Sequence, residues 1–237
     1  HDVMTTRFSP LPAFTHLSFP HTCCGCGTAL LAAHAFFCVY CLSSMPLTGF
    51  EQYASNPVEK IFWGRAEIRA ASALLYFTKN SAVQQSLHRF KYKGRKEIGI
   101  YFGKRIGQAL KNSGRFQTCQ LILPLPLFPS REKERGYNQA TILSEGISSI
   151  MHIPLITDAL VRITGTATQT HKNRIGRWQN MAGKFQVKNE EQLLGRHILL
   201  VDDIITTGAT LEACAQILLR LNGVTLSIAA LAHSVSG

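Results

Sequence analysis

Two adjacent carboxylates followed by a run of threonines are the residues best suited to chemistry. Residues 199–210 read Leu-Leu-Val-Asp-Asp-Ile-Ile-Thr-Thr-Gly-Ala-Thr. Open α/β sheets bind ligands beyond the carboxyl ends of their strands, and amides at the start of the following helix attract phosphate. Carboxylates repel phosphate but accept hydrogen bonds from sugar hydroxyls or hold Mg²⁺. The segment therefore predicts a sugar-phosphate site, while an N-capped helix after a strand is the plainer alternative.

Four cysteines form a second candidate site. Cys23 and Cys26 make one Cys-x-x-Cys pair, and Cys38 and Cys41 make another, with eleven residues between the two pairs. Four such thiolates bind Zn²⁺ tetrahedrally and stabilise a module too small for its own core. Because no coordination position stays open, this zinc would be structural. A disulfide cluster is the alternative, disfavoured by the odd total of seven cysteines, and the neighbouring Cys24 leaves the exact ligand set open.

Positive charge is concentrated in two stretches. The chain has 237 residues, with 25 Lys and Arg against 14 Asp and Glu, for a net charge of +11. Residues 79–135 hold thirteen basic and three acidic residues, and residues 162–184 hold five basic ones and no acid. This distribution favours a polyanionic partner, with solvated helix faces as the alternative. Aromatic residues lie among and beside Lys91, Lys93, Arg95 and Lys96, an arrangement that fits a groove for single-stranded nucleic acid, with core-facing aromatic rings and solvated lysines as the alternative.

Composition excludes several classes of protein. The chain is 46% hydrophobic and 16% charged, which suits a folded domain rather than a disordered tail. No apolar run approaches the length of a spanning helix, and the first residues lack the pattern of a secretory signal. We therefore expect no membrane insertion and a cytoplasmic location.

Strand and helix patterns alternate along the chain. Strands are expected at 69–77, 121–125, 198–201 and 224–231, and helices from Ser81, through 98–110, and over 140–150 and 211–221. Such alternation predicts an α/β domain with a mainly parallel sheet. The predicted divisions are 1–50 with the four-cysteine zinc module, 51–80 as linker and early strand, and 81–237 as the ligand-binding domain.

The 199–210 segment resembles the phosphoribosyl pyrophosphate (PRPP) motif of type I phosphoribosyltransferases. Three further features are similar to the ComF family of ComFC- and GntX-like proteins: the Arg-Gly-Tyr-Asn-Gln run at 135–139, Gln169 with Arg177 and Asn180, and the double Cys-x-x-Cys. The resemblance extends from about Cys23 to His233. It implies a type I phosphoribosyltransferase-like fold, a mainly parallel sheet flanked by helices, preceded by a small zinc-ribbon-like module with four cysteine ligands.

The resemblance also implies a PRPP site used with Mg²⁺. Asp202 and Asp203 correspond to the acids that bind the ribose hydroxyls. The pyrophosphate loop would lie at 123–127, including Leu125 and Pro126, with Arg135 as a contact supported by Asn138 and Gln139. The loop that binds the 5′-phosphate corresponds to Thr206, Thr207, Gly208, Ala209 and Thr210.

A mobile loop that covers PRPP in this fold would lie between Arg162 and Phe185. Its residues Arg174 and Arg177 would close over the pyrophosphate and stabilise the leaving charge. These two arginines and the acidic pair, Asp202 and Asp203, are therefore the candidates for catalysis.

Three functions agree with these features. Because the ComF family is associated with natural competence, the first is a PRPP-binding protein of DNA uptake that also binds single-stranded DNA. The second is an active phosphoribosyltransferase of nucleotide metabolism. The third is a zinc module that docks to a DNA-processing partner such as a competence helicase.

Overall fold

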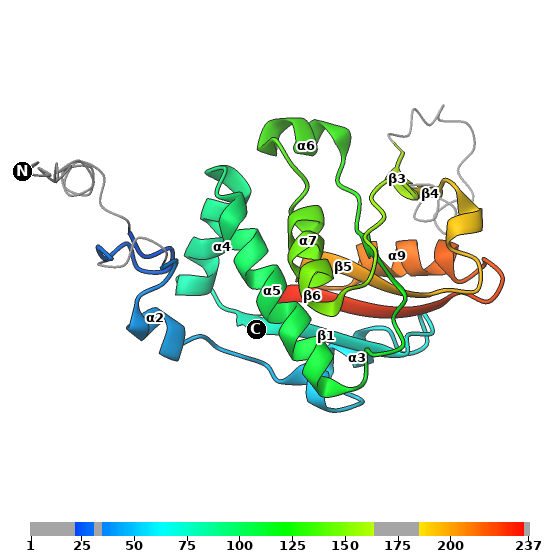
Figure 1. The fold of residues 1–237 in the computed structure, drawn as a ribbon, viewed down its shortest axis with the longest axis horizontal. Coiled ribbons are helices and arrows are strands. Elements are labelled where there is room, and N and C mark those ends of the chain that lie inside the picture. Colours follow the sequence, from blue (N-terminus) through cyan, green and yellow to red (C-terminus); the bar gives the residue numbers. More distant parts are fainter. Residues whose placement is uncertain (1–21, 31–34, 164–184, 235–237) are drawn as a thin grey trace, which may run out of the picture.

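A parallel sheet forms the centre of the protein (Figure 1). The computed structural model describes residues 22–30, 35–163 and 185–234. Four strands pair in the order β1-β6-β5-β2, and every neighbouring pair is parallel. The expected α/β class with a mainly parallel sheet is confirmed. The strands of this sheet are β1 (Ala70–Phe77), β2 (Leu121–Pro124), β5 (His197–Ile205) and β6 (Thr225–Ser234).

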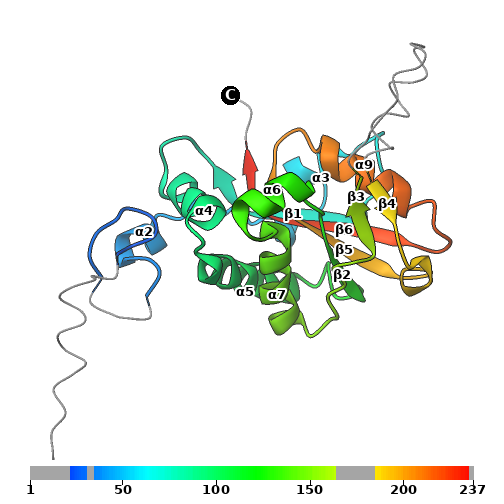
Figure 2. The same ribbon diagram turned by 90° about the horizontal axis from the view of Figure 1, so that it is seen from above.

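Helices cover both faces of the sheet. Figure 2 shows α5 and α7 on one face and α3 and α9 on the other, so that each face has its own apolar core. A Cβ atom at Gly103 would lie 2.2 Å from the carbonyl oxygen of Leu143, so the close contact of α5 with α7 requires glycine. The bounds of these helices are α3 (Pro57–Ile61), α5 (Lys96–Ser113), α7 (Gln139–Met151) and α9 (Ala209–Leu218).

The expected helix after Ser81 is α4 (Ala82–Tyr92). The Ser81 side chain accepts a hydrogen bond from a first-turn amide, and the predicted inward positions Val83, Leu87 and Phe90 are all buried. Serine therefore caps this helix, and the 3.6-residue period gives its buried face correctly.

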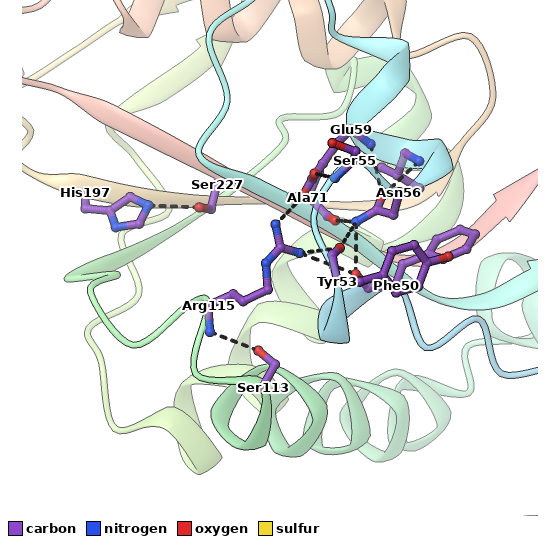
Figure 3. A network of polar contacts seen from close by, with 11 residues as sticks. Phe50, Tyr53, Ser55, Asn56, Glu59, Ala71, Ser113, Arg115, His197 and Ser227 are labelled. Carbon is purple, nitrogen blue, oxygen red and sulfur yellow. Dashed lines mark hydrogen bonds and ion pairs between the residues drawn. The ribbon is translucent and has the colours of Figure 1, made fainter.

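The first part of the stretch expected to be linker and early strand, residues 51–61, packs against the sheet (Figure 3). The buried Asn56 caps α3 and donates to the carbonyl oxygens of Phe50 at 2.9 Å and Ala71 at 2.8 Å. Glu59 of α3 accepts from the Ala71 amide and pairs with Arg115 at 2.6 Å. These contacts fix α3 to β1. Since β1 is a strand of the main sheet, the main domain includes residues before the expected boundary at 81.

Shorter elements complete the described chain. The strands β3 and β4 form a separate antiparallel pair, which lies beside helix α9 (Figures 1 and 2). No helix within residues 22–30, 35–163 and 185–234 has both the length and the apolar character needed to cross a bilayer. The shorter elements are α2 (Val39–Ser43), η1 (Phe50–Gln52), α6 (Pro129–Arg135), β3 (Leu160–Arg162), β4 (Phe185–Val187) and η2 (Glu190–Gln192).

Candidate functional site

The acidic pair lies inside β5, near its carboxyl end. The strand was expected to stop at Val201, but its pairing with β6 continues through Asp202 to Ile205. Alternation along a strand directs the two side chains to opposite faces of the sheet. Asp203 is on the side of α4, and Asp202 is on the side of α9. The Asp203 amide donates to the Asp202 carboxylate at 2.7 Å, so the pair also stabilises itself locally.

The two acids have different electrostatic surroundings. Burial, and then the charge of Asp203, raise the pKa of Asp202 from 3.8 to about 7. The Asp203 amide, Lys91 and Arg162 act in the opposite direction. Asp203 forms an ion pair with Lys91, whose Nζ lies 2.7 Å from its Oδ2. The raised pKa of Asp202 shows that a nearby cation or a hydroxyl donor would stabilise this carboxyl group, and carboxylate oxygen atoms are the ligands that Mg²⁺ prefers.

The threonine loop follows β5 directly and leads into α9. Thr206 and Thr207 are exposed, and Gly208 has φ +71°, in the left-handed region. A Cβ atom on Gly208 would lie 2.6 Å from the Ile61 side chain of α3. Glycine is therefore required twice, by its backbone angle and by contact with α3. The exposed amides and hydroxyls at the start of α9 can accept an anionic group.

Arg65, just after α3, holds the threonine loop from the side. Its guanidinium donates to the Thr207 carbonyl oxygen at 3.0 Å and to the Ile61 carbonyl oxygen at 3.1 Å. It also donates to the Glu212 carboxylate of α9 at 2.8 Å. Arg65 therefore ties three segments around the loop. Sequence analysis missed it, because an arginine more than a hundred residues from its partner leaves no local pattern.

The expected pyrophosphate loop begins beside the acids. The Leu125 amide donates to the Val201 carbonyl oxygen at 2.8 Å, which places the start of this loop beside Val201, the residue before Asp202 in β5. The Asn138 side chain donates to the Leu125 carbonyl oxygen at 2.9 Å and caps α7. Asn138 therefore holds the start of this loop through its side chain.

Arg135 and its neighbours tie this loop region to α4. The Arg135 guanidinium donates to Gln139 at 2.7 Å and lies 5.4 Å from the centre of the Tyr92 ring. The Tyr137 hydroxyl donates to the Phe90 carbonyl oxygen. The 135–139 run therefore contacts the last turn of α4, the helix whose Lys91 pairs with Asp203, and Gln139 is the hydrogen-bond partner of Arg135.

Arg162 is a residue of the site that sequence analysis counted only as charge. Its guanidinium stacks 3.6 Å from the centre of the Phe128 ring, and its charge lowers the Asp202 pKa. Within the described part of the chain its Nε atom is buried without a hydrogen-bond partner. The other loop residues named from the sequence, Arg174 and Arg177 with Gln169 and Asn180, lie outside the described residues.

The four predicted cysteines come together. Their sulfur atoms lie within 4.8 Å of one another, and Cys26 Sγ is 3.7 Å from Cys38 Sγ. A tetrahedral zinc site with bonds of about 2.3 Å needs sulfur separations of nearly 4 Å, so the arrangement fits a metal. Hydrogen bonds from Thr28 are the main cause that lowers the pKa of Cys26 to about 6, which favours the thiolate that a metal binds.

Cys24 is outside this cluster and joins it to the main domain. It is fully buried in the core formed with α4 and α5, and burial raises its pKa. The Ser86 hydroxyl donates to the Cys24 carbonyl oxygen at 3.3 Å, and Arg89 donates to the Cys23 carbonyl oxygen at 3.3 Å. Of the three cysteines at positions 23, 24 and 26, Cys23 and Cys26 therefore belong to the cluster, and Cys24 is a core residue.

The expected DNA-binding residues divide into two groups. Lys91 pairs with Asp203, and Arg95 pairs with Glu97, whereas Lys93 and Lys96 are exposed. Of the aromatic residues in and beside this basic stretch, Phe90 and Phe102 are buried and Tyr101 is half-buried, while Tyr92 is 52% exposed. Phe90 and Phe102 are therefore core residues, and the basic surface is smaller than the sequence suggests.

The sequence is similar to a known domain family and to several named proteins. The family model for the phosphoribosyl transferase domain matches residues 137–236. An Escherichia coli protein named DNA utilization protein YhgH is 31% identical over 145 residues, which are 60% of this chain and 63% of the relative. Competence protein F of Haemophilus influenzae is 30% identical, covering 62% of this chain and 66% of the relative. Competence protein ComFC of Bacillus subtilis is 34% identical, covering 61% and 56%. The chain thus spans less than two thirds of these relatives.

Proposed function

Because this chain is a relative of the ComF proteins and carries a phosphoribosyltransferase domain, we propose that it binds PRPP or a related ribose 5-phosphate in DNA uptake. One observation carries the proposal. The acidic pair and the threonine loop follow one another at the carboxyl end of β5, and the 125–126 loop, distant in sequence, follows the neighbouring strand β2 at the same edge of a parallel sheet. This edge is where such folds bind ligands.

Each part of the site has a role in this proposal. Asp202 and Asp203 accept hydrogen bonds from the ribose hydroxyl groups, and their carboxylate oxygen atoms would hold the Mg²⁺ that accompanies the ligand. The 5′-phosphate binds the amides and hydroxyls of 206–210. Leu125 and Pro126 supply the pyrophosphate loop, and Arg135 and Arg162 add positive charge beside it. Arg174 and Arg177 are proposed to cover the pyrophosphate.

We propose two further ligands. The Cys cluster holds a structural zinc, since four thiolates leave no position for substrate. Exposed Lys93, Lys96, Lys104 and Lys111, with Tyr92, bind single-stranded DNA in the cytoplasm. This surface is supported by its charge and by the competence proteins among the relatives.

Calorimetric titration with PRPP and Mg²⁺ tests the main proposal. We expect saturable binding that the Asp202→Asn, Asp203→Asn double variant loses. For DNA, we expect single-strand affinity to fall as salt rises and to weaken in Lys93→Ala with Lys96→Ala. Absence of PRPP binding at millimolar ligand would reject the ribose phosphate proposal.

Active phosphoribosyl transfer is the second candidate function, favoured by the match to the transferase domain. Pyrophosphate release in the presence of PRPP and each nucleobase in turn distinguishes it from binding alone. Turnover that requires both acids would establish the enzyme, and PRPP binding without turnover would support the binding protein.

A further inference from the structure

The Lys91 to Asp203 ion pair links a helix end to the candidate ribose site. Lys91 is in the last turn of α4, its Nζ lies 2.7 Å from Asp203 Oδ2, and the two side chains are only 17% and 16% exposed. We propose that Lys91 pairs with the Asp203 carboxylate when no ligand is bound, and that it competes with a divalent cation for this carboxylate. This inference rests on the proposed function, because it concerns the carboxylates assigned to ribose and Mg²⁺.

The position of Lys91 is fixed by its neighbours on α4. The preceding carbonyl oxygen, that of Phe90, accepts a hydrogen bond from the Tyr137 hydroxyl, and the Phe90 side chain is fully buried. Arg89, the residue before Phe90, and Ser86, about one turn earlier, hydrogen-bond to the backbone carbonyl oxygens of Cys23 and Cys24. These contacts fix the end of α4, so the Lys91 ammonium group is held close to Asp203. A lysine on a free surface would sample many positions and hold a carboxylate only weakly.

Lys91 and a metal ion cannot share the same carboxylate oxygen without strong repulsion. Mg²⁺ binds carboxylate oxygen at about 2.1 Å, so a cation on Oδ2 would lie close to the ammonium. Repulsion between such charges is strong where solvent is partly excluded, and both side chains here are mostly buried. Lys91 must therefore move away, or the metal must bind elsewhere, before Asp203 can act as a ligand. Lys91 is thus a positioning residue that sets how much divalent cation the site needs.

A Lys91→Met variant tests this competition directly. Methionine keeps an unbranched side chain of similar length and removes the charge. Lys93→Met is the matched control, because it removes the same charge two residues later from an exposed position. Lys91→Arg retains a cation beside Asp203. If Lys91→Met does not fold, Lys91→Gln makes the same comparison.

The first measurement uses Mn²⁺ alone, with free ion followed by electron paramagnetic resonance. We expect Lys91→Met to bind Mn²⁺ about tenfold more tightly than the parent, and Lys93→Met and Lys91→Arg to stay within about twofold of it. Equal affinity in the parent and Lys91→Met, or no Mn²⁺ binding by either, would overturn the proposal.

The second measurement uses PRPP and separates this inference from the proposed function. We expect Lys91→Met to reach half-maximal PRPP binding at a Mg²⁺ concentration several-fold below that of the parent. Weaker PRPP binding by Lys91→Met at saturating Mg²⁺ would make Lys91 a ligand contact and overturn the competition. If no variant binds PRPP but Lys91→Met still binds Mn²⁺ more tightly, the proposed function fails while the competition stands.

Discussion

The two adjacent acids are expected to respond to the same substitution in opposite directions. Asp202 has its pKa raised from 3.8 to about 7, chiefly by burial, whereas Asp203 holds Lys91 in an ion pair. Asparagine keeps the shape of either side chain and can still accept a hydrogen bond, but it carries no charge. The variants Asp202→Asn and Asp203→Asn therefore separate the cost of a buried charge from the benefit of a paired one.

The sign for Asp202 follows from proton linkage. The folded protein keeps the Asp202 proton up to about pH 7, while the unfolded chain loses it near pH 4, so the unfolding free energy falls as pH rises through that interval. At about 1.4 kcal/mol for each pH unit, the full loss is at most about 4 kcal/mol above pH 7. Residual solvent contact reduces this, and we expect Asp202→Asn to exceed the parent by roughly 1–3 kcal/mol at about pH 8. Near pH 4 the two should agree.

The same change at Asp203 removes the partner of a lysine that is only 17% exposed. Leaving this ammonium unpaired costs roughly 1–3 kcal/mol, partly offset because Asp202 loses a repelling neighbour. Asp203→Asn should therefore be no more stable than the parent, and at about pH 8 it should lie roughly 2 kcal/mol or more below Asp202→Asn.

Urea unfolding followed by circular dichroism, at about pH 5 and pH 8 without added divalent cations, measures both differences. The parent is the common reference, so titration of groups that do not interact with the two acids cancels. Our reasoning would be refuted if Asp203→Asn were the stabilised variant at the higher pH, or if the Asp202→Asn difference did not grow with pH.

Three further predictions concern the threonine loop and the Cys cluster. Gly208→Ala should lower the free energy of unfolding by about 2–4 kcal/mol, because the new Cβ atom would lie 2.6 Å from the Ile61 side chain of α3. Gly64 has a similar φ of +69° but no atom within 4 Å of such a Cβ, so Gly64→Ala should lower it by only about 1 kcal/mol. Equilibrium unfolding measures both differences. Arg65→Ala should weaken PRPP binding by roughly 3–10-fold in calorimetry, with a stability loss near or below about 1 kcal/mol, because its contacts are exposed; unchanged affinity would argue against a role in shaping the loop. Cys26→Ser should lose the zinc that metal analysis finds in the parent, whereas Cys24→Ser should keep it; the reverse would exchange their roles.

Local patterns predicted the elements that carry the site. The apolar run before Asp202 and the helix after Gly208 are both present, because strand alternation and helix start signals act over a few residues. The limit of the strand was wrong, since β5 continues to Ile205. Its pairing with β6 stabilises a stretch whose charged residues resemble a loop in sequence. Tertiary hydrogen bonding overrode the local signal there.

Long-range partners were not predictable from one sequence. Arg115 belongs to the basic stretch by position, yet it pairs with Glu59 and fixes α3. Lys91 was assigned to nucleic acid on the same grounds and instead contacts Asp203. A charge pattern describes only the order of residues along the chain, whereas an ion pair depends on which residues the fold brings together. The predicted DNA surface therefore shrinks to the lysines that have no such acidic partner among the described residues.

Helix α4 makes the Cys cluster and the acidic pair parts of one structure. Within six residues it contacts the Cys module through Ser86 and Arg89, the 135–139 run through the Phe90 carbonyl oxygen, and the acidic pair through Lys91. A displacement of the Cys module would act on the same helix whose last turn delivers the ammonium to Asp203. The Cys cluster and the acidic pair are therefore joined through a single helix, so we expect loss of the cluster to disturb the Lys91 to Asp203 ion pair.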